Sequence, residues 1–257
     1  KSNRKPTPTR SEAVEGKLAR TQAASAAAPL FPMRINKYLA WKNYCTRREG
    51  DEYVKDGRVL LNGKRAVLGD KVQETDAVEV RFRVKNYRYY VYNKPKGIIT
   101  HSPDEGEQDI RQVIPVQGVF PIGRLDKGSH GLMILTDDGR ITDKLLNPEY
   151  AHEKEYMVTT HEKLSPSFKT KMEAGVNIEG YQTKPCKISL VGESKFLIVL
   201  TEGKKHQIRR MCAALGYTIA DLQRRRVMNL SLDGLPQGKH RALEGKMLSD
   251  FLKELGF

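Results

Sequence analysis

Residues 123–136 read GRLDKGSHGLMILT and place one carboxylate, Asp126, directly before an apolar run. Two basic residues, Arg124 and Lys127, flank this acid, and glycines lie close on either side of it. The apolar run predicts a strand at Leu132–Thr136, because a short continuous apolar stretch bounded by glycine is typical of a buried strand. A lone acid at the mouth of a hydrophobic strand is therefore a candidate for a reactive group.

The composition of the chain favours a polyanionic partner. Its 257 residues include 45 Lys and Arg against 31 Asp and Glu, which gives a net charge of +14. A charge this far from zero says little about the fold but favours a polyanion, and the phosphate backbone of nucleic acid is the commonest one. A basic surface that is simply solvated is the alternative reading of the charge alone.

The cysteines and histidines predict neither a disulfide framework nor a metal site. Cys45, Cys186 and Cys212 are far apart and odd in number, and the six histidines show no metal-ligand spacing. A reducing compartment suits such cysteines, so we expect a cytoplasmic location. No apolar run has the length of a membrane span. The Arg/Ser/Ala-rich start lacks a secretory signal, and Glu12 and Glu15 weaken its likeness to a mitochondrial transit peptide.

Residues 1–32 predict a basic, low-complexity tail without stable structure, because they offer little to bury. Order is expected to begin at Met33 with a short amphipathic helix. The apolar positions of this helix are Ile35, Tyr38, Leu39 and Trp41.

The next stretch predicts a second helix and a small hairpin sheet. Thr46 and Glu49 have the spacing of a capping box, and the helix that they start runs to about Lys55. Asn62-Gly63 indicates a type I′ turn between two strands. The expected strands are Arg58–Leu61, Lys64–Val67 and Ala77–Phe82.

INKYLA (35–40) and TRREGDEYVKDGRVLLNGKRA (46–66), followed by Gly69-Asp70, resemble the alpha-L RNA-binding domain. The resemblance implies a compact module at residues 33–82 whose two-helix face presents basic side chains to RNA phosphates. The matching positions are Arg34, Lys37, Arg47, Arg48, Lys55, Arg58, Lys64 and Arg65. Any one of them alone would be interpreted as an ordinary surface cation, so the prediction of RNA binding rests on the cluster together with the motif.

Residues 83–88 predict a polar linker, and residues 89–257 predict a larger domain. Its strands rarely alternate one for one with helices, so we expect an α+β fold with a mixed, largely antiparallel sheet. The expected strands are Tyr90–Asn93, Leu132–Thr136, Glu155–Thr160, Lys187–Val191 and Phe196–Leu200. The expected helices are Ile141–Leu146, Ser165–Ala174 and Gln207–Leu215, with Ser165-Pro166 as the cap and first turn of the middle one.

A second resemblance rests on residues 123–136, HEKEYMVTT at 152–160 and GKKHQIRRM at 203–211. With the supporting segments NKPKGIIT (93–100), VFPIGRLD (119–126) and 222–243, they resemble the pseudouridine synthases, in particular the ribosomal RsuA/RluB/RluF type. The resemblance covers residues 33–257. It implies an isomerase that detaches uracil from C1′ of a uridine, rotates it and rejoins it through carbon 5, with no cofactor and no metal.

The resemblance gives roles to four side chains. Asp126 would be the reactive carboxylate, as nucleophile or proton acceptor. Apolar surroundings favour a neutral acid, so a cation must keep it ionised, and the family's paired residue maps onto Arg209 as a bidentate partner. Tyr156 would stack on the uracil and could move a proton from carbon 5, unless it is a half-buried strand tyrosine. Arg124 would fill the space left by the extruded base, or contact a phosphate.

Further residues are expected around the substrate. His206 and Gln207 are expected in the base pocket, as are Leu132 and Ile208, whose roles in the pocket and in the core are equally open. The residues expected to contact RNA phosphates are Lys94, Lys96, Arg224, Arg225 and Arg226. The alternative for the three arginines is a solvated edge strand, and the histidines other than His206 are expected at the surface.

The matches are closest to the RluF-like branch of the family. This branch implies a uridine of 23S large-subunit ribosomal RNA as the target, with a tRNA uridine in a similar loop as a second substrate. The alternative is a 16S small-subunit enzyme of the same layout, and a second alternative is a non-catalytic ribosome assembly factor. A glycoside hydrolase would need two carboxylates across the bond, and the motifs supply one. We expect a monomer that binds ribosomal RNA and no membrane.

Overall fold

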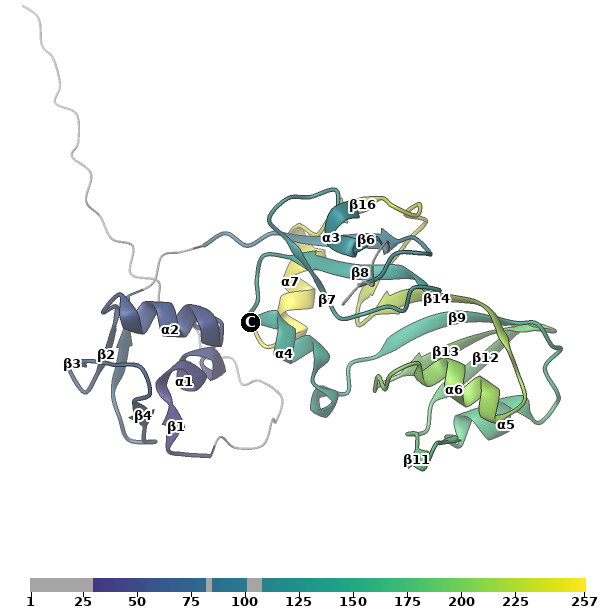
Figure 1. The fold of residues 1–257 in the computed structure, drawn as a ribbon, viewed down its shortest axis with the longest axis horizontal. Coiled ribbons are helices and arrows are strands. Elements are labelled where there is room, and N and C mark those ends of the chain that lie inside the picture. The colour runs from purple at the N-terminus through teal and green to yellow at the C-terminus, as the bar shows by residue number, and fades with distance from the viewer. Residues whose placement is uncertain (1–29, 82–84, 101–107) are drawn as a thin grey trace, which may run out of the picture.

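The computed structural model describes residues 30–81, 85–100 and 108–257. The predictions for residues 1–29, for the first part of the linker and for His101 lie outside the described residues. Figure 1 shows a small N-terminal module, which contains the elements β1 to β5, beside a larger domain built on one long twisted sheet. No helix in the described ranges is long and apolar enough to cross a membrane.

The N-terminal module follows the sequence pattern closely. Thr46 Oγ1 accepts from the Glu49 amide at 3.2 Å and Glu49 Oε2 accepts from the Thr46 amide at 2.9 Å, which confirms the capping box. Asn62 and Gly63 both have positive φ, +51° and +74°, as a type I′ turn requires. The elements are β1 (Met33–Arg34), α1 (Ile35–Trp41), α2 (Arg47–Lys55), β2 (Val59–Leu61), β3 (Lys64–Arg65), β4 (Lys71–Val72) and β5 (Val78–Val80).

The larger domain holds a nine-stranded sheet whose main path runs β12-β13-β9-β14-β8-β6-β16, with β7 and β15 attached. The bounds of these strands are β6 (Tyr89–Lys94), β7 (Phe120–Ile122), β8 (His130–Thr136), β9 (Lys154–Thr160), β12 (Lys187–Gly192), β13 (Lys195–Leu200), β14 (Ile219–Val227), β15 (Leu230–Ser231) and β16 (His240–Ala242). Only β8 and β14 pair in parallel among the described strands of this sheet, so the prediction of a mixed, largely antiparallel sheet is confirmed.

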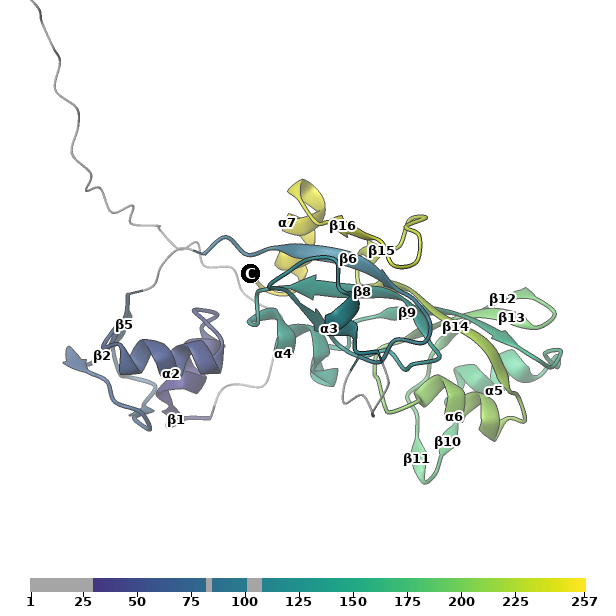
Figure 2. The same cartoon turned by 45° about the horizontal axis from the view of Figure 1, so that its top comes forward.

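Helices cover both faces of this sheet (Figure 2). They are α3 (Ile110–Val113), α4 (Ile141–Leu146), α5 (Phe168–Glu173), α6 (Gln207–Ala214) and α7 (Gly245–Glu254), with a 3₁₀ turn at Pro148–Tyr150 and a hairpin of β10 (Asn177–Ile178) and β11 (Tyr181–Gln182). The predicted cap of the middle helix is wrong, because α5 begins at Phe168 after Ser167. The Phe168 amide instead donates to the Ser165 carbonyl in the preceding turn.

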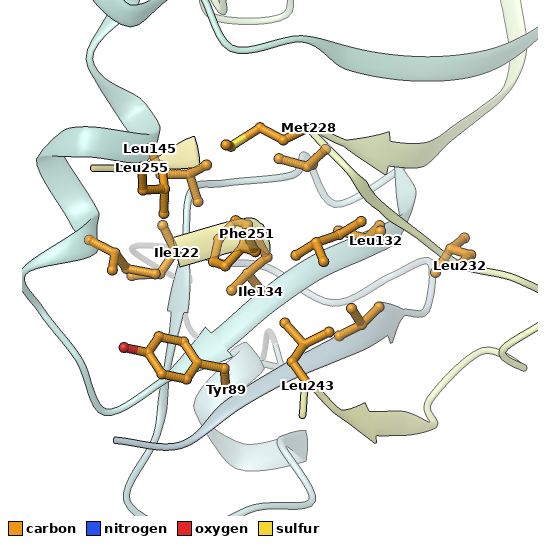
Figure 3. Close-up of a cluster of buried hydrophobic side chains, with 14 residues drawn as sticks. Tyr89, Ile122, Leu132, Ile134, Leu145, Met228, Leu232, Leu243, Phe251 and Leu255 are labelled. Atoms are coloured by element: carbon orange, nitrogen blue, oxygen red, sulfur yellow. The ribbon is translucent and has the colours of Figure 1, made fainter. Parts of the chain in front are cut away.

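Strand β8 is buried on both faces, and its alternating side chains enter two different cores. Leu132 and Ile134 pack with Phe251 of α7 in the cluster of Figure 3, called here the α7 core. Met133 and Leu135 pack on the other side with Ile110 of α3, in the α3 core.

Tyr156 of β9 identifies the face on which the α3 core lies. Its ring packs against the α3 core and also against the α6 core, to which Ile208 belongs. The α3 and α6 cores therefore share one face of the sheet, opposite the α7 core.

Gly131 makes the parallel pairing of β8 and β14 sterically possible. Its φ is +112°, and a Cβ at this position would lie 2.2 Å from the Arg224 carbonyl oxygen and 2.7 Å from the Arg224 nitrogen. Real Cβ atoms essentially never approach so closely. Only glycine therefore allows the two strands to meet at this point.

Candidate active site

Asp126 lies in a short loop, residues 126–129, that leads into β8 and is called here the acid loop. The Ser129 amide donates to the Asp126 carbonyl at 3.0 Å, which closes the loop on itself. The Gly97 amide donates to the Lys127 carbonyl at 2.8 Å and ties the loop to the turn after β6. These backbone bonds fix the direction in which the carboxylate leaves the chain.

The buried side chain of Lys94 anchors the acid loop to the interior of the domain. Its side chain is fully buried, and Nζ donates to the carbonyls of Ser129 (2.8 Å), Pro95 (3.1 Å) and Asp126 (3.3 Å). Burial lowers the pKa of Lys94 to about 8, and the Asp126 carboxylate partly opposes this shift. The expected contact of Lys94 with RNA phosphate is therefore wrong, because three converging carbonyls hold the ammonium inside the domain.

Replacing Lys94 with methionine will change how stability depends on pH. The folded pKa of about 8 lies below the ordinary 10.5, so between these values the unfolded state binds more protons and the free energy of unfolding rises with pH. Across this pH range Lys94 should add about 3 kcal/mol to the free energy of unfolding. Chemical denaturation across this range should show the rise in the wild type and in Lys96→Met, and not in Lys94→Met. Equal pH slopes in all three proteins would contradict the buried charge.

Two basic side chains from the start of α6 face the Asp126 carboxylate. Arg209 Nε lies 3.8 Å from Oδ2, and His206 Nε2 lies 3.5 Å from Oδ1. Arg209 also donates from Nη2 to Ser129 Oγ at 3.2 Å, so its guanidinium spans the acid loop. The expected bidentate pair is absent, because one edge of the guanidinium is used by Ser129, a residue that the sequence analysis missed.

The acid is also more open than expected. The Asp126 side chain is 36% exposed, so water reaches it in the free protein. Any group that covered this side chain would lower the local dielectric and so strengthen its interactions with Arg209 and His206.

Replacing Arg209 with alanine should lower kcat about 10²–10³-fold, the usual effect of losing one group that stabilises charge in a reaction centre. The change removes a counter-charge of Asp126 and leaves Ser129 Oγ without this donor. Turnover measured over a range of concentrations of the RNA expected from the sequence separates kcat from KM. Arg210→Ala is the matched control, since the neighbouring guanidinium pairs with Glu179 at 2.6 Å, away from the acid. A defect in KM alone would contradict the pairing with Asp126.

Tyr156 and Arg124 are linked to the acid in different ways, Tyr156 through the α3 core and Arg124 through its place two residues before Asp126 in the chain. Tyr156 is half-buried and packs against the α3 core, which contains Leu125, the residue before Asp126. Its hydroxyl has no hydrogen-bond partner within the described part of the chain. Arg124 is exposed, and no described residue forms an ion pair with it. Neither the Tyr156 hydroxyl nor the Arg124 guanidinium is therefore paired with another described residue.

The structure separates the four expected pocket residues. His206 reaches Asp126, and Ile208 is buried in the α6 core beside Arg209. Leu132 lies in the α7 core on the opposite face, because it alternates with Met133 along β8 (Figure 3). The side chain of Gln207 is buried and binds Glu202 (2.6 Å) and the Lys204 amide (2.8 Å), so it shapes the start of α6 rather than a pocket.

Most of the cations expected on RNA near the site have partners within the protein. Arg224 is buried and donates to the Leu132 carbonyl at 2.7 Å, and Arg226 binds Glu153 at 2.9 Å. Only Arg225 of the three is exposed, because β14 is a central strand rather than a solvated edge. Lys96 pairs with Asp221, which also binds the buried ring of His130 at 3.1 Å. His130 is therefore not the surface residue that was expected.

The expected basic side chains of the N-terminal module are exposed, with one exception, and one of them, Lys55, is paired with Glu52 at 2.9 Å. Arg58 is half-buried and its guanidinium lies 4.4 Å from the centre of the Tyr53 ring. The exposed members of the expected set are Arg34, Lys37, Arg47, Arg48, Lys55, Lys64 and Arg65. Among the described residues, no group of three His, Cys, Asp or Glu side chains could hold a metal ion.

Comparisons with known proteins match both parts of the chain. Residues 88–214 match the family model described as RNA pseudouridylate synthase, and residues 33–78 match the S4 domain. The dual-specificity RNA pseudouridine synthase RluF of Escherichia coli K12 is 42% identical over 233 residues, which cover 88% of this chain and 80% of that protein.

Two further relatives extend this similarity. The ribosomal large subunit pseudouridine synthase B of Bacillus subtilis is 34% identical over 224 residues, covering 82% of this chain and 91% of that one. A crystal structure of a pseudouridylate synthase superposes with a TM-score of 0.63 at 24% identity, over 87% of this chain and 99% of the other, and shows the shared fold.

Proposed function

This chain belongs to the RNA pseudouridylate synthase family and carries an S4 domain, and from that premise we propose that it converts a uridine of large-subunit ribosomal RNA to pseudouridine. The Bacillus relative is a ribosomal large subunit pseudouridine synthase by name, and that similarity supports large-subunit RNA as the substrate. The Escherichia relative is named dual-specificity, so we propose a tRNA uridine as a second substrate.

The observation that carries the chemistry is the setting of Asp126. Its carboxylate faces two basic groups, Arg209 and His206, on a loop that Lys94 fastens to the domain. The reaction needs a carboxylate that can attack the nucleotide or accept a proton, and Arg209 and His206 are placed to bind and orient it. No carboxylate of a described residue pairs with Arg209 or His206 other than Asp126, which fits a one-acid reaction better than glycoside hydrolysis.

The neighbouring side chains suggest how the uridine is held. Tyr156 is a platform on which the uracil can stack, and base–aromatic stacking contributes about 1–3 kcal/mol per base. Arg124 is free to enter the gap that the extruded nucleotide leaves in the RNA. The exposed cations of the S4 domain supply phosphate contacts, so binding should weaken as the salt concentration rises.

The test uses ribosomal RNA from cells that lack this protein. Pseudouridines are mapped by chemical labelling and primer-extension stops, with wild-type or Asp126→Asn protein added back. One large-subunit stop that disappears and returns only with the wild type is the expected result. A missing small-subunit stop would overturn the choice of RNA and keep the chemistry. Unchanged stops in ribosomal RNA and tRNA alike would favour a non-catalytic role.

A further inference from the structure

The turn that follows β8 carries a buried ion pair that the reaction does not use. Asp138 is fully buried, and Arg140 donates to its two carboxylate oxygens from Nε (2.8 Å) and Nη2 (2.7 Å). The Tyr89 hydroxyl donates to the same carboxylate. A bidentate pair of this kind fixes the plane and direction of the guanidinium.

The Arg140 guanidinium joins three separate parts of the chain. Its Cζ lies 4.3 Å from the ring centre of Tyr87 in the linker and 5.1 Å from that of Phe257. A cation between two aromatic faces is attracted to both. The remaining nitrogen, Nη1, donates to the Asn43 carbonyl of the N-terminal module at 3.4 Å. Arg140 therefore lies at the junction of the module, the linker and the last residues of the larger domain.

The loop between α1 and α2 makes further contacts at this junction. Asn43 Nδ2 donates to the Gly256 carbonyl at 3.2 Å. Thr46, the cap of α2, lies so close to Gly139 that a Cβ there would be 2.6 Å from its Cγ2. Figures 1 and 2 both show this loop on the side of the module that faces the larger domain. We call residues 43–46 the plug, and Tyr87, residues 137–140 and residues 256–257 the seat.

The described part of the linker is also bound rather than free. The Arg88 amide and Nε donate to the Asp137 carboxylate at 2.8 and 3.0 Å, and its Nη2 donates to the Gln117 carbonyl at 3.2 Å. Lys85 lies 3.8 Å from Glu49 of α2. Residues 85–88 were expected to form a polar linker, and the structure makes them part of the junction.

The plug directly precedes the exposed Arg47 and Arg48 of α2. Holding the plug in the seat therefore fixes the direction in which these cations point relative to Asp126. An RNA long enough to contact both α2 and the active site should bind more tightly, because the fixed geometry raises the effective concentration of the second site once the first is bound. The affinity of an RNA that contacts only the active site should not depend on this geometry.

We infer that the seat around Arg140 docks the S4 domain in one orientation and that this docking helps to determine which uridine is modified. Gly139 and Arg140 are positioning residues, because they orient the S4 domain and do not contact the RNA themselves. The effect on RNA rests on the proposed function, whereas the docking itself does not.

The first measurement needs no RNA. Residual dipolar couplings of the full chain should fit one common alignment tensor for the module and the larger domain. In Gly139→Leu the new side chain meets Thr46, and the two parts should then need separate tensors. The φ of Gly139 is not left-handed, so a leucine can adopt the backbone conformation of this position without strain. Asn43→Gly is a milder second variant that keeps the φ of +60° and removes only the amide contact with Gly256.

The second measurement compares a minimal stem-loop around the target uridine with a long transcript of the surrounding RNA. In Gly139→Leu, KM for the long transcript should rise about tenfold while kcat on the stem-loop stays unchanged. Gly192→Leu is the matched control, because Gly192 ends β12 and a Cβ there would meet nothing closer than 3.9 Å.

Two results would overturn the inference. Separate alignment tensors in the wild type would show that the module is not docked. Equal kinetic losses on both RNAs in Gly139→Leu would show that the seat serves only the stability of the fold. If the target lies in another RNA, the alignment result still stands, so failure of the proposed substrate is distinguishable from failure of the docking.

Discussion

Replacing Asp126 with asparagine will reduce pseudouridine formation at least about 10⁴-fold, the scale of loss seen when a reacting group is removed. Asparagine keeps the size of the side chain and removes the charge between Arg209 and His206. It can neither attack the nucleotide nor accept a proton as a carboxylate does. RNA affinity should stay within about twofold, because phosphate contacts dominate binding.

Release of hydrogen from carbon 5 of the uracil measures this turnover, and a filter-binding titration measures the affinity. Asp143→Asn is the matched control, since Asp143 is an exposed acid in the first turn of α4. Retained turnover in Asp126→Asn would exclude the proposed role of the acid. A parallel loss of RNA binding would instead indicate that the acid loop had unfolded.

Replacing Gly131 with alanine should lower the free energy of unfolding by about 4 kcal/mol, which combines the strain of an unfavourable φ with overpacking. The new methyl group would collide with the Arg224 backbone, so β8 and β14 would have to separate. Backbone atoms of a central strand cannot move aside as a flexible side chain can. The shift in the midpoint of chemical denaturation measures the loss.

Gly180→Ala separates the two causes. Gly180 has a φ of +84° in the β10–β11 turn, and a Cβ there would meet nothing within 4 Å. This control should show the backbone strain alone, about 1 kcal/mol. Equal losses in the two variants would mean that the contact between Gly131 and Arg224 adds nothing to the strain.

Local signals in the sequence predicted the local parts of the fold. The Thr46–Glu49 box and the Asn62-Gly63 turn act within a few residues, so their chemistry is visible without tertiary structure. The central place of β14 was not predicted, because its three arginines were expected on RNA phosphates or, as the alternative, on a solvated edge strand. In the structure β14 pairs with β8 and β9 in the interior of the sheet, and Arg224 is turned inward, where it binds the Leu132 carbonyl. Helix α7, which covers the α7 core, was also missed.

The motifs named Asp126, Tyr156 and Arg209 as catalytic residues but gave no sign of the residues that hold the acid loop in place. The order of Asp126, Tyr156 and Arg209 followed from motifs, and the structure brings Arg209 to the acid. The burial of Lys94 was not visible, since the three carbonyls that bind it meet only in the folded domain. A lysine beside a proline turn normally lies at the surface, and nothing in its neighbours along the chain contradicts that expectation.

The parallel pairing of β8 and β14 also explains why two distant motifs meet. Parallel strands begin at the same end of a sheet, so the segments that precede them arrive together. The acid loop precedes β8, and α6 with Arg209 precedes β14. The acid and its partner thus come together only through a contact between segments remote in sequence, a kind that forms slowly because it closes a long loop. During folding, catalytic competence would appear only after the two halves of the sheet have joined.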